Sequence, residues 1–143
     1  MKARDIMTSE LEVVTRQDSL QRAATLMRDA DVGAIPVVED QDSMRLVGLI
    51  TDRDIAIRHV AGENSADCTV GDHMTEGQIY RVSPDDDVDT VMKTMKSEQI
   101  RRVPVCEGDR LVGIIAQADI ATDGIDDAKT GEVVERISEP NRR

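Results

Sequence analysis

Two stretches of the chain decide its fold. Residues 46–55 read Leu-Val-Gly-Leu-Ile-Thr-Asp-Arg-Asp-Ile, and residues 111–120 read Leu-Val-Gly-Ile-Ile-Ala-Gln-Ala-Asp-Ile. In both, an apolar run typical of a strand leads into a polar segment typical of a helix start. The same order of residue types at two places indicates an internal repeat.

The repeat extends outward from these stretches in both directions. Asp-Ile-Met-Thr at residues 5–8 matches Asp-His-Met-Thr at 72–75, and Ile-Pro-Val at 35–37 matches Val-Pro-Val at 103–105. The polar turn between the two apolar runs is shorter in the second copy, as loops tolerate. We therefore expect one repeat at residues 3–61, a linker at 62–69, a second repeat at 70–123, and a tail or short helix at 124–143.

Each copy predicts the same order of elements. Apolar residues recur with helical spacing from Leu20 to Met27 and from Val88 to Met95, and acidic or hydroxyl residues precede both runs as helix caps. An extended piece precedes each helix, and two apolar strands and a second helix follow it. The predicted fold class is α+β, built from two β-α-β-β-α repeats. One such unit buries little surface alone, so two units should cover each other.

Composition excludes several classes of function. The 143 residues carry 29 acidic and 18 basic side chains, a formal net charge of −11, which argues against nucleic-acid and anionic-membrane surfaces. With one tyrosine and no phenylalanine or tryptophan, the chain has no base-stacking platform. No stretch approaches the ~20 apolar residues of a membrane span, and no signal peptide is recognisable. We expect a cytoplasmic protein.

The cysteines and histidines give no metal-binding pattern. Cys68 and Cys106 are too few for a disulfide framework. Cys68, His73 and His59 could be considered as zinc ligands, but their spacing supplies neither a recognisable motif nor a fourth ligand. We therefore predict no metal site, with His73 capping or packing locally and Cys106 as a buried thiol in a strand.

The repeated residues resemble a known family. Asp-Ile-Met-Thr, then Ala-Ile-Pro-Val, then Val-Gly-Leu-Ile-Thr-Asp-Arg-Asp-Ile is similar to the cystathionine-β-synthase (CBS) domain. Two copies resemble a stand-alone CBS pair, or Bateman module, of the size of small bacterial stress-associated proteins. The resemblance implies repeats packed sheet to sheet around a pseudo-two-fold axis, with two clefts between them. It also implies homodimers, and adenosine ligands such as AMP, ADP, ATP or S-adenosylmethionine, with no required cofactor.

The turn from Gly48 to Asp54 matches the family's Gly-x-x-Thr/Ser-x-x-Asp pattern in full. The Thr51 hydroxyl and the first amides of the helix could bind phosphate, and the Asp54 carboxylate could accept two ribose hydroxyls. The alternative is that Thr51 and Asp54 form only a capping box, with Asp in place of Glu or Gln. Both interpretations stay open at this point.

The resemblance adds residues from the second copy to this first site. Arg101 and Arg102 precede Val-Pro-Val where family members place basic residues on phosphate, although a surface salt bridge to Glu98 is the alternative. Tyr80 lies where the family contacts adenine, although a lone tyrosine often only packs. The predicted first site comprises Thr51, Arg53, Asp54, Tyr80, Ser83, Arg101 and Arg102.

The second site lacks part of the pattern. Ala116 stands where the first copy has Thr51, and Ala118 where it has Arg53, while Asp119 keeps the ribose acceptor. We expect this degraded site to bind more weakly or to stay empty. Its predicted residues are Thr15, Gly33, Ala34, Ile35, Ala116 and Asp119.

No arrangement of nucleophile, base or paired acids suggests an enzyme. The favoured function is a regulatory module that senses an adenosine-containing ligand and passes the signal to an unknown protein effector. The alternative is a ligand-free structural or protein-interaction module with vestigial clefts. We expect a homodimer in either case, with Ala23, Ala24, Val91 and Met92 as helix contacts between protomers.

Overall fold

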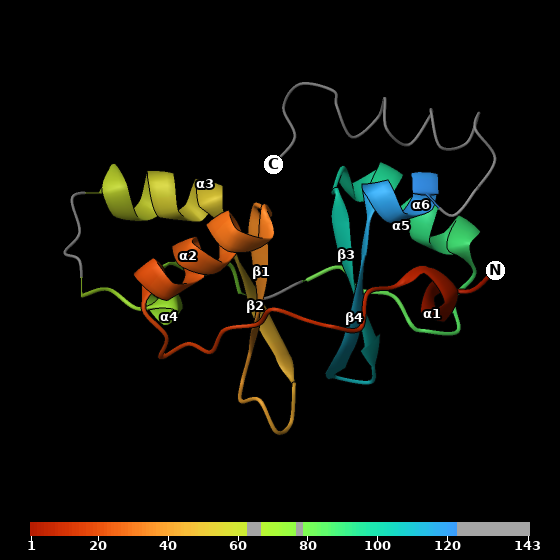
Figure 1. The fold of residues 1–143 in the computed structure, drawn as a ribbon, viewed down its shortest axis with the longest axis horizontal. Coiled ribbons are helices and arrows are strands. Elements are labelled where there is room, and N and C mark those ends of the chain that lie inside the picture. Colours follow the sequence, from red (N-terminus) through yellow and green to blue (C-terminus); the bar gives the residue numbers. More distant parts are fainter. Residues whose placement is uncertain (63–66, 77–78, 123–143) are drawn as a thin grey trace. The chain divides into compact units, whose positions relative to one another are not determined.

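The computed structural model describes residues 1–62, 67–76 and 79–122, which form two compact units (Figure 1). The continuous unit is Glu12–Ile79. The split unit joins Met1–Leu11 to the described residues from Tyr80 onward. The tail expected at 124–143 lies outside the described residues.

The described part of the continuous unit contains an amphipathic helix, a hairpin and three short helical segments. Helix α2 begins where the Ser19 hydroxyl accepts the Arg22 N–H at 3.1 Å, as a serine cap should. Its buried side chains include Leu20 and Met27, the two ends of the predicted apolar run. The elements are α2 (Leu20–Ala30), β1 (Ala34–Val38), β2 (Leu46–Thr51), α3 (Asp52–Asp54), the π-helix η1 (Ile55–Val60) and α4 (Val70–His73).

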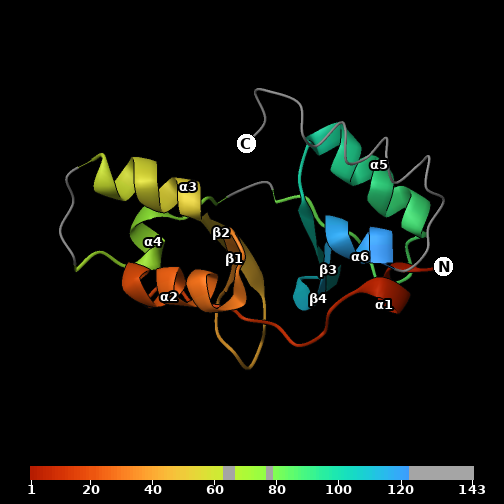
Figure 2. The same ribbon diagram turned by 45° about the horizontal axis from the view of Figure 1, so that its top comes forward.

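Strands β1 and β2 pair antiparallel, with Ala34 opposite Thr51. Single bridges extend this sheet on both sides: Val14 pairs parallel with Val37, and Thr75 pairs antiparallel with Leu49. The predicted first strand of the repeat is therefore reduced to one bridge. In Figure 2, α3 and η1 form one coil that leaves the end of β2, as the repeat predicted for its second helix.

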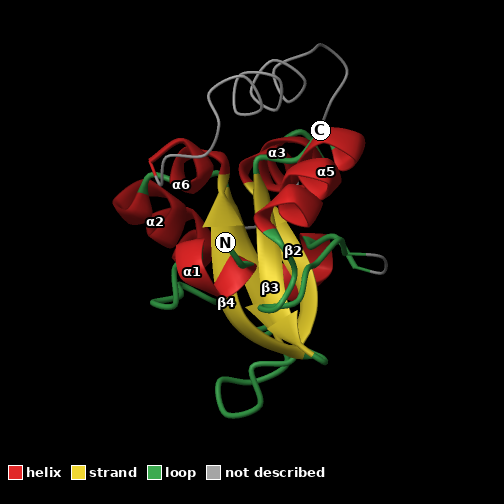
Figure 3. Ribbon diagram, turned by 90° about the vertical axis from the view of Figure 1, so that its right-hand side faces the viewer, coloured by secondary structure: helices red, strands yellow, loops and turns green. Residues whose placement is uncertain are grey.

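The split unit repeats this plan with fewer residues in its turn. Its strands β3 and β4 also pair antiparallel, and Gly108 with φ 60° makes the tight turn, in a conformation that glycine adopts without strain. Figure 3 shows these strands side by side with α1 next to β4. The elements are α1 (Ala3–Ile6), α5 (Val88–Glu98), β3 (Arg102–Glu107), β4 (Arg110–Ala116) and α6 (Gln117–Thr122).

The opening segment of each repeat packs on the hairpin of the other repeat. Thr8 pairs with Ile114 at the edge of β4, so residues 1–11 belong with the second hairpin. Thr75 makes the matching pair with Leu49 of β2. The compact units therefore exchange their first ~10 residues relative to the sequence repeats, a long-range pairing that local pattern does not encode.

Each unit has its own aliphatic core. The core residues come from the faces that periodicity selected, and the α+β class is confirmed. The predicted protomer contacts are wrong for Ala23, Val91 and Met92, because these side chains are buried inside their own units, whereas Ala24 is exposed. Within the described residues, no helix has the length and apolar character needed to cross a bilayer.

Candidate functional site

The junction of β2 and α3 carries the best-matched motif. The Thr51 hydroxyl accepts the Asp54 N–H at 3.0 Å, and the Asp54 carboxylate accepts the Thr51 N–H at 3.0 Å. Thr51 is thus the N-cap of a reciprocal capping box, the alternative that the sequence left open. The box fixes the direction of both side chains but uses only part of the acceptor capacity of the carboxylate.

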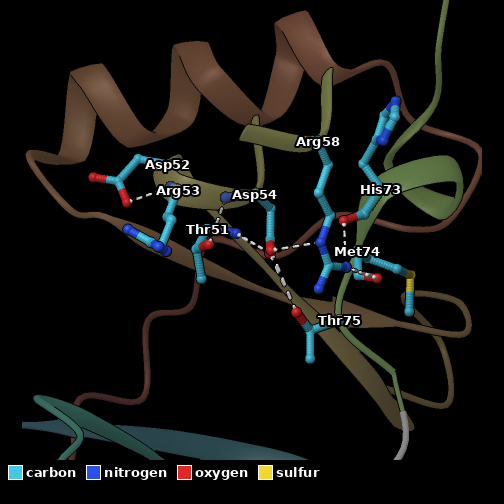
Figure 4. A network of polar contacts seen from close by, with 8 residues as sticks. All are labelled: Thr51, Asp52, Arg53, Asp54, Arg58, His73, Met74 and Thr75. Carbon is cyan, nitrogen blue, oxygen red and sulfur yellow. Dashed lines mark hydrogen bonds and ion pairs between the residues drawn. The ribbon is translucent and has the colours of Figure 1, made fainter. Parts of the chain in front are cut away.

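Asp54 is buried, with 7% of its surface exposed, which is unusual for a carboxylate in a simple cap. The Thr75 hydroxyl lies 3.4–3.5 Å from the two oxygens of this carboxylate, and the Arg58 Nε lies 3.6 Å from one of them. Figure 4 shows both side chains pointing toward Asp54. The same guanidinium lies 3.4 Å from the backbone carbonyls of His73 and Met74. Arg58 therefore offsets the buried charge and ties η1 to the end of α4.

The two residues between Thr51 and Asp54 are exposed. The Asp52 carboxylate accepts the backbone N–H of Arg53 at 2.7 Å, and the Asp52 N–H donates to the Gly33 carbonyl at 2.9 Å. A Cβ on Gly33 would lie 3.1 Å from an Asp52 carboxylate oxygen, so glycine allows this approach. The Arg53 guanidinium is on the surface beside the capping box.

Residues assigned to both predicted sites therefore meet in the continuous unit. Ala34 pairs with Thr51 and Ile35 with Ile50, so the strand from the second site borders the turn from the first. The Ile35 side chain is 1% exposed and belongs to the core, which leaves only its backbone for a ligand. Thr15 is half-buried in the same unit.

The corresponding junction in the split unit, between β4 and α6, has an incomplete capping box. The Asp119 carboxylate accepts the Ala116 N–H at 2.7 Å, but Ala116 has no hydroxyl to complete the box. Arg102 pairs with Ala116, and the Arg101 carbonyl accepts the Gln117 N–H at 2.8 Å. Both arginine side chains are exposed. Among the residues that the structure describes, neither has an ion-pair partner, so the bridge to Glu98 does not form.

The remaining predicted residues also lie in the split unit. The Ser83 N–H donates to the Asp86 carboxylate at 2.8 Å, and the Ser83 hydroxyl accepts the Asp85 N–H at 3.3 Å. Tyr80 is 36% exposed. The structure thus gathers Thr51, Arg53 and Asp54 in one unit and Tyr80, Ser83, Arg101 and Arg102 in the other, and the assembly of one site from both sets stays a prediction.

One kind of cap occurs several times along the chain. In it, an aspartate carboxylate accepts the backbone N–H of the residue three positions earlier. This cap closes turns that carry no predicted ligand role as well as those that do, so the cap alone is no sign of a ligand. What distinguishes Asp54 is its burial and its contacts with Arg58 and Thr75. The pairs are Lys2–Asp5, Thr15–Asp18, Thr51–Asp54, Thr69–Asp72, Ser83–Asp86 and Ala116–Asp119.

A second polar cluster lies where the sequence predicts no metal site. His59 Nδ1 lies 3.4 Å from His73 Nε2, and the ligand atoms of His59, Cys68 and His73 all lie within 4.8 Å of one another. The intervals of nine and five residues between them match no short metal motif, so only the fold reveals the grouping. The other thiol, Cys106, is buried in β3 as predicted, and desolvation raises its pKa.

Comparison with known proteins agrees with this fold. A family model of the CBS domain matches residues 3–59 and 70–123. The chain is 39% identical over 142 residues to the uncharacterized protein YlbB of Bacillus subtilis, covering 99% of this chain and 95% of that protein.

Two solved structures are also similar. Hypoxic Response Protein I, solved with two coordinated zinc ions, is 37% identical with a TM-score of 0.75, covering 85% of this chain and 98% of that one. The CBS domain pair of protein MJ0100, in complex with 5′-methylthioadenosine and S-adenosyl-L-methionine, is 28% identical with a TM-score of 0.72, covering 85% and 94%.

Proposed function

This chain belongs to the CBS domain family, and we propose that it is a non-catalytic regulatory module that senses an adenosine-containing ligand. The observation that carries the proposal is the buried Asp54 carboxylate in the intact Gly-x-x-Thr-x-x-Asp turn at the end of β2. The adenosine compounds bound to the similar CBS pair of MJ0100 support this ligand class.

Asp54 is suited to hold a ribose. One of its oxygens accepts the Thr51 N–H, while the other has, among the described residues, only the long contacts from Thr75 and Arg58. The Thr75 contacts of 3.4–3.5 Å are weak hydrogen bonds, so a ribose diol at normal distance would replace them at little cost, while Arg58 stays as the counter-charge of the carboxylate. A carboxylate accepting two hydroxyls is a common way to read ribose.

Thr51 and the arginines would bind phosphate or another polar group on the ligand. Arg53 is exposed next to the capping box, and Arg101 and Arg102 are exposed without ion-pair partners among the described residues. On a chain with net charge −11, such arginines are the groups that can attract an anion. Tyr80 and Ser83 complete the first site in this proposal.

The second site, with Thr15, Gly33, Ala34, Ile35, Ala116 and Asp119, would bind more weakly. Ala116 removes one hydroxyl donor, and Ala118 removes one guanidinium. A charge-assisted hydrogen bond contributes roughly 1.5–3 kcal/mol, so the loss of one corresponds to about 10- to 150-fold in affinity. The two sites should therefore fill in sequence as the ligand concentration rises.

The output would be a population shift. A ligand that contacts both units favours one of their arrangements only if it binds that arrangement more tightly. We propose that the chain acts as a homodimer that passes this change to a protein effector, in the cytoplasm and in a stress response.

A ligand-free interaction module is the second candidate, and the capping box favours it. The Thr51–Asp54 box already satisfies both backbone amides without a ligand, and the same cap closes the Thr69–Asp72 turn. In that case Asp54 would serve only the local structure.

Thermal unfolding with AMP, ADP, ATP and S-adenosylmethionine separates the two candidates. A ligand at 100 times its dissociation constant stabilises the folded chain by about 2.7 kcal/mol, which raises the unfolding midpoint clearly. We expect such a rise with at least one of these compounds. If none raises the midpoint at millimolar concentration, the interaction module replaces the sensor.

A further inference from the structure

Both histidines of the chain meet one of its two cysteines in the continuous unit. His59 comes from the π-helix η1, Cys68 precedes α4, and His73 ends α4. His73 is buried, while His59 and Cys68 are half-buried. Within the described residues, Asp54 and His73 are the two buried polar side chains, so each calls for a physical explanation.

We propose that His59, Cys68 and His73 bind a divalent cation of the zinc class. Tetrahedral zinc with bonds of about 2.0–2.3 Å holds two nitrogen ligands about 3.3 Å apart, and a nitrogen and a sulfur about 3.6 Å apart. His59 Nδ1 and His73 Nε2 are 3.4 Å apart, and Cys68 Sγ lies within 4.8 Å of both. A rotation of the Cys68 side chain would close the remaining gap.

The fold does not need a polar residue at His73. Its counterpart in the other repeat is Ile6, which ends the equivalent capped turn α1 and is buried in the other core. An aliphatic side chain therefore suits this position, whereas a buried imidazole has to find a polar partner. The partner of His73 is a second imidazole, that of His59, and the Cys68 thiol lies beside both. These three side chains are a typical set of metal ligands, whereas an aliphatic residue would suffice for packing.

The chemistry of the donors selects the metal. Two imidazoles and one thiolate suit borderline-soft ions such as Zn²⁺, whereas Mg²⁺ and Ca²⁺ prefer oxygen. On binding, the Cys68 thiol loses its proton to solvent, and both imidazoles bind as neutral rings through the facing nitrogens. Three protein ligands leave the fourth tetrahedral position to water or to an exogenous group.

The local backbone already holds these ligands in place. The Cys68 carbonyl accepts the Leu20 N–H at 3.3 Å, which anchors the segment before α4. Arg58, next to His59, contacts the carbonyl of His73 at 3.4 Å and the Asp54 carboxylate at 3.6 Å. A bound metal would therefore fix η1 against α4 and stiffen the surroundings of Asp54. The site itself does not depend on the proposed adenosine function.

Titration of the full chain with Co²⁺ after chelator treatment tests the proposal. A thiolate bound to Co²⁺ gives a charge-transfer band in the near ultraviolet, and four-coordination gives intense visible bands. We expect both signals to saturate at one Co²⁺ per chain and to disappear when Zn²⁺ is added. Zn²⁺ alone should raise the midpoint of thermal unfolding.

Matched variants assign the ligands. Cys68→Ser should abolish the charge-transfer band, while Cys106→Ser, which removes the other thiol, should retain it. His73→Ile, which copies the other repeat, should weaken Co²⁺ binding by more than about 100-fold, since loss of a supporting residue alone costs 10- to 100-fold. Because His59 is half-buried and outside the core, His59→Ala provides a second histidine variant should His73→Ile not fold. No band from the unmodified chain, or an undiminished band in Cys68→Ser, would overturn the proposal.

Discussion

Gly48 and Gly113 occupy the same place in the two repeats, but substitution by alanine should lower the free energy of unfolding more at Gly48 than at Gly113. Both face the bulged end of the neighbouring strand, opposite Val37 and Val105. A Cβ on Gly48 would lie 2.2 Å from the Met74 Cε and 2.7 Å from the Thr75 carbonyl oxygen. The methionine side chain can rotate away, but the carbonyl belongs to the backbone.

The cost at Gly48 follows from that carbonyl. Thr75 and Leu49 exchange two backbone hydrogen bonds of 3.0 and 2.8 Å, which a displaced carbonyl would strain. Overpacking costs about 1–3 kcal/mol, and each strained hydrogen bond adds up to about 1 kcal/mol. Removing a glycine from a strand returns about 0.5–1 kcal/mol. Gly48→Ala should therefore lower the free energy of unfolding by about 1–4 kcal/mol.

Gly113→Ala is the matched control. The three atoms nearest to its Cβ would all belong to the side chain of Met7, at 2.5 Å for Sδ, 2.8 Å for Cγ and 3.0 Å for Cβ. Since Met7 is half-buried and flexible, we expect a loss of about 1 kcal/mol. Urea unfolding with an unchanged slope measures both losses. If Gly113→Ala cost as much as Gly48→Ala, the exchange of opening segments would not have the geometry described.

Three further predictions concern local features. Ser19→Ala should cost about 1 kcal/mol by removing the side-chain cap of α2, and Asp87→Ala, whose carboxylate makes no such bond at α5, should cost less in urea unfolding. Cys106 should react with a thiol reagent far more slowly than Cys68 and faster as pH rises, because burial raises the Cys106 pKa; equal rates would contradict its placement in β3. The hydrogen bond from the Ser43 N–H lowers the pKa of Asp40, so the unmodified chain should have a higher free energy of unfolding than Asp40→Asn above the unfolded-state pKa of Asp40. This difference should vanish as pH falls through the folded-state pKa. A difference that persists in acid would be inconsistent with this.

Much of the fold could be predicted because the determinants are local and occur twice. The run from Leu20 to Met27 has helical spacing and a serine before it, and the structure has α2 at Leu20–Ala30. The apolar runs around Pro36 and Gly48 predict the hairpin, since each run has strand length and a polar turn separates them. The repeat supplied the second copy of each element.

What the sequence did not predict depends on long-range contacts. The turn α1 is too short to have a periodic signal, and its place beside β4 depends on the Thr8–Ile114 pairing across the chain. The π-helix η1 likewise has no signature in the run Ile55–Val60. His59 and His73 are 14 residues apart, so their contact follows only from the packing of η1 on α4.

The sequence predicts residues for two candidate adenosine sites, and the assembly of these residues into sites stays a prediction. The Thr51–Asp54 turn was identified from its motif, and its capping box was foreseen as the alternative. The burial of Asp54 and its contact with Arg58 could not be foreseen, because Thr75, which is 21 residues from Asp54 in the sequence, and the end of α4 reach this turn.

Calorimetric titration of the unmodified chain and three aspartate variants tests the central claim most directly. AMP, ATP and S-adenosylmethionine would each be titrated into the chain, Asp54→Ala, Asp119→Ala and Asp5→Ala, the last losing an equivalent cap from a turn with no predicted ligand role. We predict a tight site that Asp54→Ala removes and Asp5→Ala retains, and a weaker site that depends on Asp119. No heat with any compound at millimolar concentration would contradict the account, and so would a tight site that Asp119→Ala removes while Asp54→Ala leaves it intact.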